Sequence, residues 1–440
     1  MRIAYITDTF LPEINGVTTS IDAHARAMAM RGHDGLIICP RYRKPILHVI
    51  PRTHIKRYRS FSFLTNKETR IAVPSILAIA RDLRRFRPDV VHVHTPLSVG
   101  VVGLATARML RLPVIETYHT YIPDFMQYVE PHRLLRLDDL QDRVINSLVF
   151  ARMFEATGSQ WLGRLIAGDG GLVDEIMDAT DAVIGTEGPA GPGQLSSLVA
   201  WQFTRALYNR AALVLTPSVT LKRELEANGV TVPVEYLSNG IDLSLIVPKT
   251  DYAATGRLIH AGRLGHEKNV DVVIRAFARV ADRFPDITLD IVGDGPAREG
   301  LERLAARLGL AGRVRMRGFM DRHLLGRLYR EYDLFVTAST IETQGIVLLE
   351  AMAAGLPVVG VDALALPELV QHERNGLIVA PGDEAAFGHA MARLLDDQAE
   401  RSRFGAACRE DVQAHALDAV AGRLERIYTE TAAGAQNQRP

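Results

Sequence analysis

Two glutamates in the second half of the chain lie in a segment whose residue types suit the binding of a hydroxylated, charged ligand. Glu342 comes just before Gly345, and Glu350 follows eight positions later within an apolar run. Ionised carboxylates accept hydrogen bonds and pair naturally with vicinal hydroxyls. If a helix starts after the turn, several backbone N–H groups stay free beside the positive end of its dipole, where they can bind phosphate or a sugar oxygen. These groups belong to Thr343, Gln344, Gly345 and Ile346.

The neighbours of Glu350 argue against a purely structural role for these acids. An isolated pair of glutamates at such positions is more often a helix cap and an exposed helix acid. Here the flanking residues are apolar, namely Leu348, Leu349, Ala351 and Met352. A charged side chain in a helix that is apolar nearly all round must be paired or must bind a ligand. The sequence therefore favours the ligand-binding interpretation.

A second set of candidates lies in the loop at residues 261–269. Arg263 can bind a phosphate with two parallel N–H groups, and Lys268 supplies a point charge. The loop follows a predicted strand, and ligands of doubly wound domains bind at the carboxyl ends of strands. The alternative is a surface loop with a salt bridge between Glu267 and Lys268.

The first half of the chain offers Gly16 and His119. Gly16 lies at the expected start of a helix, where a residue without a side chain lets a pyrophosphate approach closely. The surrounding segment is neither the glycine-rich dinucleotide motif nor a Walker sequence. His119 follows a predicted strand, where its imidazole could donate to a substrate hydroxyl, and a structural histidine is an equally good explanation.

Short, continuously apolar runs alternate with helix-length segments along most of the chain. Such runs are typical of parallel strands that are buried on both faces. Strands are predicted at residues 3–7, 36–39, 90–94, 114–117, 213–216, 258–261, 287–292, 314–317, 334–337, 358–361 and 377–379. Helices are predicted at residues 17–31, 270–284 and 298–308. This alternation predicts an α/β protein with two doubly wound, Rossmann-like domains.

The domain boundary is expected in the turn-rich stretch at residues 238–242. We assign residues 1–240 to an N-terminal domain and residues 241–431 to a C-terminal domain. The polar end, residues 432–440, is expected to be disordered.

The region at residues 120–210 breaks the alternation of strands and helices. A helix is predicted over residues 132–154 and another over residues 194–208, with Gly/Pro-rich loops between them. We interpret the region as a helical insertion in the first domain.

The composition excludes several classes of protein. The chain has 440 residues, of which 47% are hydrophobic and 23% charged, as in ordinary globular proteins. Its 51 basic and 51 acidic residues cancel, which disfavours a nucleic-acid binder. The two cysteines, Cys39 and Cys408, have no partners at metal spacing, which disfavours a disulfide scaffold or a zinc module. Neither a transmembrane run nor a signal peptide is recognised, so a cytosolic enzyme is expected.

Basic residues are concentrated near the N-terminus. Residues 1–110 carry 17 Lys/Arg against 7 Asp/Glu. One group occupies residues 41–44 and 52–59, just before Phe61 and Phe63. The other consists of Arg81, Arg84, Arg85 and Arg87. Basic residues beside aromatic ones are typical of a surface that contacts anionic lipid headgroups. A solvated face or a phosphate-binding loop is the alternative.

Together these residues resemble the family-4 retaining glycosyltransferases of the GT-B fold. The resemblance covers nearly the whole chain, apart from residues 120–210 and the tail. Its most specific element is the spacing of Glu342 and Glu350, with seven residues between them. The other matching segments, in the expected order, are the Gly16 turn, the turn at 239–242 and the loop at 262–269. More narrowly, the segments at 8–17, 94–96, 118–121 and 342–345 look like those of the diacylglycerol glycosyltransferases.

The resemblance implies a role for each candidate. Glu350 would hold the ribose hydroxyls of a nucleotide-sugar donor, and Glu342 with the backbone of residues 343–346 would hold the donor sugar. The donor base would lie near Phe319.

The charged and catalytic roles are implied in the same way. Arg263 and Lys268 would neutralise the diphosphate leaving group, with assistance from Gly16. His119 would contact the sugar and help support charge at the anomeric centre. No metal would be needed in the site, and no cofactor is expected because the nucleotide sugar is itself a substrate.

The implied architecture is two domains that face a central cleft. The implied reaction is the transfer of a hexose, with retention of configuration, from a UDP-sugar or from GDP-mannose to a lipid such as diacylglycerol. The enzyme would work peripherally at the inner, cytoplasmic face of the cell membrane, and the anionic surface of that membrane would be a partner.

Two alternatives stay open: the same donor chemistry on a soluble sugar or sugar-phosphate acceptor, and a sugar-nucleotide epimerase. The stretch at residues 151–205 departs from the family, in which the first domain reaches its last strand sooner.

Overall fold

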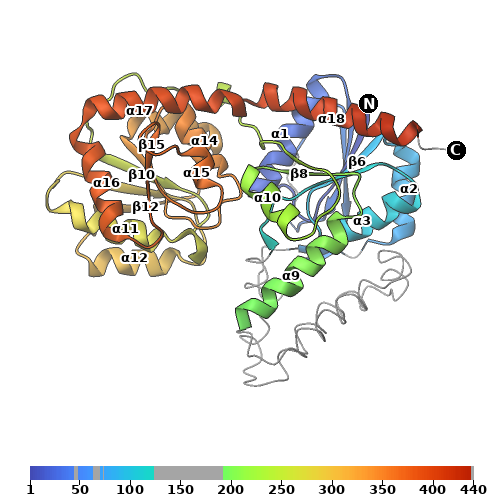
Figure 1. Cartoon of the computed structure of the whole chain (residues 1–440), viewed down its shortest axis with the longest axis horizontal. Coiled ribbons are helices and arrows are strands. Elements are labelled where there is room, and N and C mark those ends of the chain that lie inside the picture. Colours follow the sequence, from blue (N-terminus) through green and yellow to red (C-terminus); the bar gives the residue numbers. More distant parts are fainter. Residues whose placement is uncertain (44–47, 63–69, 73, 123–191, 438–440) are drawn as a thin grey trace. The chain divides into compact units, whose positions relative to one another are not determined.

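The computed structural model describes residues 1–43, 48–62, 70–72, 74–122 and 192–437. The described chain forms two compact units, each built on a parallel sheet with helices on both of its faces (Figure 1). This arrangement confirms the predicted α/β class. The first unit contains described residues within 1–217, 221–237 and 423–437, and the second contains residues 218–220 and 238–422.

A seven-stranded parallel sheet forms the core of the first unit. In spatial order its strands are β3 (Thr53–Tyr58), β2 (Asp34–Pro40), β1 (Arg2–Ile6), β6 (Val90–Val93), β7 (Val114–Thr117), β8 (Leu213–Thr216) and β9 (Val234–Tyr236). The five central strands are almost entirely buried, which explains their continuous apolar runs and confirms their prediction. The edge strands β3 and β9 carry polar residues and were not predicted.

The helices of the first unit occupy the expected crossovers between strands. They are α1 (Gly16–Met30), α2 (Ile76–Phe86), α3 (Ser98–Met109), α9 (Pro192–Tyr208) and α10 (Val219–Ala227). A short antiparallel pair, β4 (Ser60–Ser62) and β5 (Arg70–Ala72), stands apart from the main sheet. Helix α9 confirms the helix predicted over residues 194–208, whereas the helix predicted over 132–154 lies outside the described residues. None of the described helices combines the length and the hydrophobicity of a transmembrane segment.

The C-terminal helix α18 (Leu417–Asn437) corrects two predictions. The second unit ends at Gly422 instead of residue 431, because the chain returns to the first unit from Arg423 onward. Residues 432–437, expected to be disordered, continue this helix, and Ala432 is buried. Burial of the apolar face of α18 explains the order. In the same unit, the Tyr428 hydroxyl lies 2.7 Å from His92 Nδ1.

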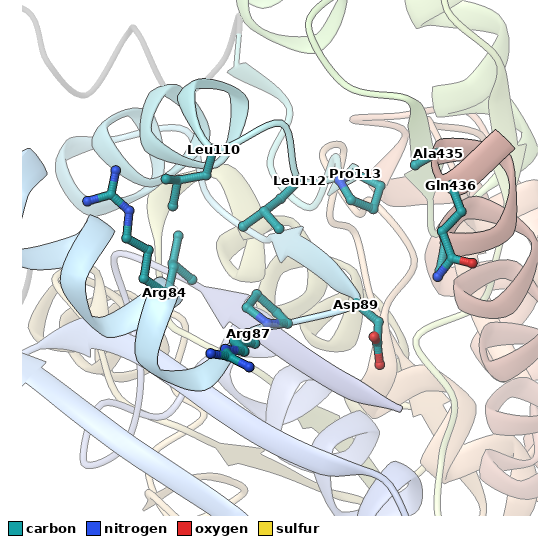
Figure 2. A pocket seen from close by; sticks show the side chains of 11 residues that line it. Arg84, Arg87, Asp89, Leu110, Leu112, Pro113, Ala435 and Gln436 are labelled. Carbon is teal, nitrogen blue, oxygen red and sulfur yellow. The ribbon is translucent and has the colours of Figure 1, made fainter. Parts of the chain in front are cut away.

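A cavity of about 550 Å³ opens in the first unit where β6 and β7 begin. Its walls come from the end of α2, from the turn between α3 and β7, and from α18 (Figure 2). Arg84 and Arg87 lie on one side of this cavity, and Asp89 and Gln436 lie on the other. The cavity is therefore at the amino ends of the strands, opposite the edge where ligands of such sheets bind.

The second unit contains a six-stranded parallel sheet. In spatial order its strands are β12 (Val314–Gly318), β11 (Thr288–Val292), β10 (Arg257–Ala261), β13 (Leu334–Val336), β14 (Val358–Val361) and β15 (Gly376–Val379). All six were predicted. Its α-helices are α11 (Val270–Ala281), α12 (Arg298–Arg307), α13 (Arg322–Leu328), α14 (Ile346–Ala353), α15 (Leu366–Leu369), α16 (Glu384–Asp396) and α17 (Gln398–Asp411). Short 3₁₀ turns are η1 (Leu243–Leu245), η2 (His266–Lys268), η3 (Tyr329–Glu331) and η4 (Val412–His415).

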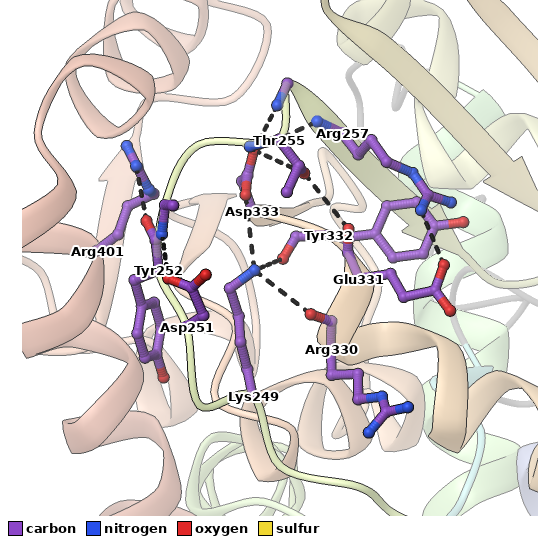
Figure 3. Close-up of polar contacts among 12 residues, drawn as sticks. Lys249, Asp251, Tyr252, Thr255, Arg257, Arg330, Glu331, Tyr332, Asp333 and Arg401 are labelled. Carbon is purple, nitrogen blue, oxygen red and sulfur yellow. Dashed lines mark hydrogen bonds and ion pairs between the residues drawn. The ribbon is translucent and has the colours of Figure 1, made fainter.

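A buried polar network fixes the segment that leads into β10 (Figure 3). The carboxylate of Asp333, just before β13, accepts hydrogen bonds from the backbone N–H groups of Thr255 (2.8 Å) and Gly256 (2.7 Å). The ammonium of Lys249 donates to the Tyr332 carbonyl at 2.9 Å and lies 3.6 Å from Asp333. Because buried charges must be paired, this network holds β10 and β13 at a defined spacing.

Glu116 in β7 makes the stability of the first unit depend on pH. Burial raises the pKa of Glu116 to about 8, against the smaller opposing effect of Arg108 and Arg210. The folded chain therefore holds a proton that the unfolded chain releases near pH 4.5, and stability is lost as the pH rises from about 4.5 through about 8.

We expect Glu116→Gln to remove this loss. Urea unfolding at pH 8.5 should give the variant a free energy of unfolding that exceeds that of the unchanged protein by about a few kcal/mol. At pH 5 the two free energies should converge. The exposed Glu226 on α10 provides the control, Glu226→Gln. Equal pH dependence in all three proteins would contradict the prediction.

Candidate active site

The order of strands in the second unit reverses between β10 and β13. From β10 the chain builds outward through β11 and β12, and from β13 it builds through β14 and β15 on the other side. The carboxyl ends of β10 and β13 therefore form the crevice where open α/β sheets bind ligands. The loops that follow these two strands carry the predicted residues Arg263, Lys268 and Glu342.

Lys268 and Glu342 form a direct ion pair between these loops. Lys268 Nζ donates to Glu342 Oε1 at 2.6 Å, and both side chains are partly buried. Burial alone would raise the pKa of Glu342, but the adjacent Lys268 ammonium opposes this effect, and the combined surroundings hold that pKa below its usual value. Asn269 ties the loops together further, because its Nδ2 donates to the Ala338 carbonyl at 3.2 Å. The alternative pairing of Lys268 with Glu267 is not the one observed.

Helix α14 begins immediately after Gly345, which has φ +86°. This left-handed conformation suits glycine and turns the chain from the loop into the helix. Among the described residues, none accepts a hydrogen bond from the backbone N–H groups of Thr343, Gln344, Gly345 and Ile346. The Gln344 side chain is engaged elsewhere, since its Oε1 accepts from Asn239 N at 2.9 Å and its Nε2 donates to Ser238 Oγ at 2.7 Å. The N-terminus of α14 thus presents free donors from its backbone.

Glu350 lies in the second turn of α14 and is only 3% exposed. Its partner is Arg322, the first residue of α13, which donates from Nε at 2.8 Å and approaches from Nη2 at 2.6 Å. Burial raises the pKa of Glu350, and Arg322 partly opposes that effect. The requirement that an acid in an apolar helix be paired is confirmed. Sequence reasoning did not identify Arg322, and the only signal for it was the need for a cation.

Arg263 and Phe319 complete the carboxyl edge of this sheet. Arg263 is exposed, and no described residue forms an ion pair or hydrogen bond with its guanidinium. Phe319 follows β12 and is 60% exposed, which is unusual for an aromatic side chain of this size. Between their loops, Gly293 lets the chain pass close to Gly262, because a Cβ at Gly293 would lie 1.8 Å from the Gly262 carbonyl oxygen. The edge therefore offers a free cation and an open ring face.

The predicted residues of the first unit lie at the corresponding edge of its own sheet. His119 follows β7 and is buried, and its Nε2 lies 2.9 Å from Nδ1 of His94, which follows β6. Burial lowers the pKa of His119 to about 3, so its imidazole is neutral at physiological pH. It can exchange hydrogen bonds with a sugar hydroxyl but carries no charge of its own.

Gly16 begins α1, and its position is set by the preceding loop. Asn15 caps the helix, accepting a hydrogen bond from Thr18 N at 2.9 Å. The start of that loop is anchored by Asp8, whose buried carboxylate accepts from Leu97 N, Val99 N and Gly100 N at the start of α3. The N-terminus of α3 is thus already occupied by a side chain of the protein, and the start of α1 is the freer of the two.

Two Rossmann-like units of this topology define the GT-B class of glycosyltransferases, and solved structures agree. The structure of sucrose-phosphate synthase from Thermosynechococcus elongatus matches with a TM-score of 0.69 at 19% identity, over 98% of this chain and 99% of that one. Anabaena HepE in complex with UDP and glucose matches with a TM-score of 0.67 at 19% identity, over 98% and 100%. These likenesses establish the fold.

The family follows from the sequence. The family model of glycosyltransferase family 4 matches residues 14–156, and that of the group 1 glycosyl transferases matches residues 253–411. The chain belongs to the family-4 glycosyltransferases and is an enzyme that uses a nucleotide sugar.

Curated relatives of similar length carry different names. A GDP-mannose-dependent alpha-mannosyltransferase of Mycolicibacterium smegmatis is 28% identical over 97% of both chains. An alpha-monoglucosyldiacylglycerol synthase of Streptococcus pneumoniae is 26% identical over 90% of this chain and 78% of its own length.

We expect Arg263→Ala to weaken the binding of a nucleoside diphosphate about tenfold or more without lowering the melting temperature. The substitution removes a charge-assisted contact with phosphate, but it removes no side-chain contact within the described protein. Calorimetric titration with UDP and GDP measures the effect. The control is Arg307→Ala, which removes an exposed arginine from α12. The same loss of affinity in both variants would show a general effect of charge and contradict the prediction.

Proposed function

We propose that the enzyme transfers a hexose from a nucleotide sugar to a membrane lipid such as diacylglycerol, with retention of configuration. The observation that carries the donor half is the carboxyl edge of the second sheet. It combines Arg263, the Lys268–Glu342 pair, the free N–H groups of α14 and the buried Glu350. Cations and helix N-termini suit a diphosphate, and acids suit sugar and ribose hydroxyls.

Each candidate residue then has a defined task. Arg263 and Lys268 neutralise the diphosphate as the bond between it and the anomeric carbon breaks, and they need no metal to do so. Glu342 and the backbone at residues 343–346 hold the sugar, and Glu350 holds the ribose. An acceptor hydroxyl forms the new bond to the anomeric carbon on the face that the diphosphate leaves, and its proton passes to a departing phosphate oxygen. No protein nucleophile is required by this course.

The first unit contributes Gly16 and His119. The start of α1 at Gly16 assists in binding phosphate. His119, neutral and held by His94, accepts or donates a hydrogen bond at the sugar.

His119→Ala should therefore lower kcat at least about tenfold while changing KM for the donor less than threefold.

The exposed face of α2 supports a lipid acceptor. Leu77 is 80% exposed, and Arg81, Arg84 and Arg85 on the same helix are exposed beside it. An apolar side chain among arginines suits a surface that lies on anionic headgroups.

The other basic group contributes less to such a surface. Arg52 pairs with Asp34 at 2.9 Å, and Lys56 lies 3.6 Å from Asp82. The guanidinium of Arg57 lies 6.0 Å from the ring centroid of Phe10. These contacts belong to the edge of the sheet at β3, so we assign the membrane contact to α2. Lys44 and Phe63 lie outside the described residues.

The activity is tested with purified protein, vesicles that contain diacylglycerol, and separate donors: UDP-glucose, UDP-galactose and GDP-mannose. We expect one donor to yield an α-linked glycolipid, identified by mass spectrometry and NMR. The UDP-sugars follow from the resemblance to the diacylglycerol enzymes, and GDP-mannose is favoured by the mannosyltransferase relative that matches over 97% of both chains. Transfer only to soluble sugars, or a modified nucleotide sugar formed without acceptor, would overturn the lipid proposal.

Flotation with vesicles that contain 30 mol% phosphatidylglycerol tests the surface. Arg84→Glu combined with Arg85→Glu should weaken binding at least about tenfold, because each basic residue contributes ~1 kcal/mol near an anionic surface. The matched control is the same double reversal at Arg303 and Arg307 on α12. Unchanged flotation of the α2 variant would contradict the assignment of the membrane contact.

A further inference from the structure

The contact between Arg322 and Glu350 uses only one of the two carboxylate oxygens. Both Nε and Nη2 of Arg322 approach Oε1, at 2.8 and 2.6 Å. Among the described residues, none donates a hydrogen bond to Oε2. The usual two-point pairing of a guanidinium with a carboxylate engages both oxygens. Here the acid keeps one oxygen without a partner, although it is buried in an otherwise apolar helix.

We propose that Arg322 is a positioning residue for the nucleotide: it keeps Glu350 ionised and turns Oε2 toward the ribose hydroxyls of the donor. This inference rests on the proposed function, in which Glu350 holds the ribose. It adds a residue on a different element, α13, that touches the carboxylate and acts through it.

The energetics of burial explain why the acid needs this partner. An isolated carboxylate in an apolar environment takes up a proton, because burial penalises the charged form. A protonated acid is a poorer acceptor for hydroxyl groups than a carboxylate. Arg322 is always charged, and its side chain is 32% exposed, so the cost of desolvating the pair falls mainly on Glu350.

The position of Arg322 also fits this task. It is the first residue of α13, three positions after the exposed Phe319 at the carboxyl end of β12. Asp321 caps the helix, accepting from His323 N at 2.9 Å, and this cap fixes the start of α13. The guanidinium therefore reaches Glu350 from a defined backbone position, beside the place where we expect the base.

The test measures how much the ribose hydroxyls contribute to the affinity of each variant for the nucleotide. Binding of UDP is compared with that of 2′-deoxy-UDP and 3′-deoxy-UDP by calorimetry, with the GDP series in parallel. In the unchanged protein we expect loss of a hydroxyl to weaken binding about tenfold or more. In Arg322→Met this penalty should fall to less than about threefold, matching Glu350→Gln, although Glu350 is still present.

The matched control is Arg327→Met, which removes an exposed arginine from the same helix and should keep the full penalty. Arg322→Lys keeps the charge without the planar fork and should give an intermediate penalty. Melting temperatures verify that each variant is folded. A folded Arg322→Met with the full penalty of the unchanged protein would overturn the inference.

The pH profile supplies a readout that a merely structural role would not move. The groups that act electrostatically on Glu350 are Arg322 from α13 and the buried Tyr329 from η3. Without the guanidinium, nothing opposes the effect of burial on the Glu350 carboxyl group. The affinity of Arg322→Met for UDP should therefore increase from pH 6 to pH 9 more steeply than the affinities of the unchanged protein and of Arg327→Met. Titration of the diphosphate is common to all three and cancels. Parallel profiles would overturn the claim that Arg322 keeps the acid ionised.

The two proposals fail differently. If the unchanged protein binds neither UDP nor GDP, the proposed function is wrong and the role of Arg322 falls with it. If a nucleotide binds and the hydroxyl penalty is the same in Arg322→Met, only the role of Arg322 is wrong.

Discussion

Because all six strands of the second unit run in one direction, the loops after β10, β12 and β13 meet at a single edge of the sheet. Arg263, Phe319 and Glu342 are widely separated in the sequence, yet all three lie at the carboxyl edge of the sheet because each follows a strand of the same direction. The reversal of strand order between β10 and β13 then opens the edge at its middle. The buried pairing of Lys249 with Asp333 at the opposite ends of these strands keeps the two central strands in register.

The two glutamates of the site illustrate how burial and pairing divide the work between residues of one type. Glu342 is partly exposed and contacts an ammonium directly, so its pKa is lowered. Glu350 is nearly fully buried, and its pKa stays raised in spite of a guanidinium. The surroundings of Glu342 favour its ionised form, whereas burial of Glu350 favours its protonated form and Arg322 opposes that effect. Their different environments follow from position alone, one before the helix and one inside it.

The elements that can be predicted from the sequence are those whose signal is local. The apolar runs of the central strands and the turn before α14 are of this kind, and they position every candidate in the second unit. The polar edge strand β3 carries no comparable pattern, since half-buried strands with basic residues resemble loops. Arg322 and His94 could not be identified as partners of Glu350 and His119, because each contact joins different elements and depends on the tertiary structure. The end of the chain looked disordered because its polar face dominates the composition, while its buried face is supplied by only a few residues such as Tyr428 and Ala432.

The return of the chain to the first unit at Arg423 bears on how the protein is made. N-terminal domains generally fold first, as they leave the ribosome. Here Glu425 binds Arg31 and His33, and Tyr428 contacts His92, so the first unit receives part of its core from residues that are translated after the whole second unit. The second unit, by contrast, is complete when residue 422 has emerged. Nascent chains stalled before Arg423 has emerged would therefore carry a complete second unit and a first unit that lacks the part of α18 that packs on it.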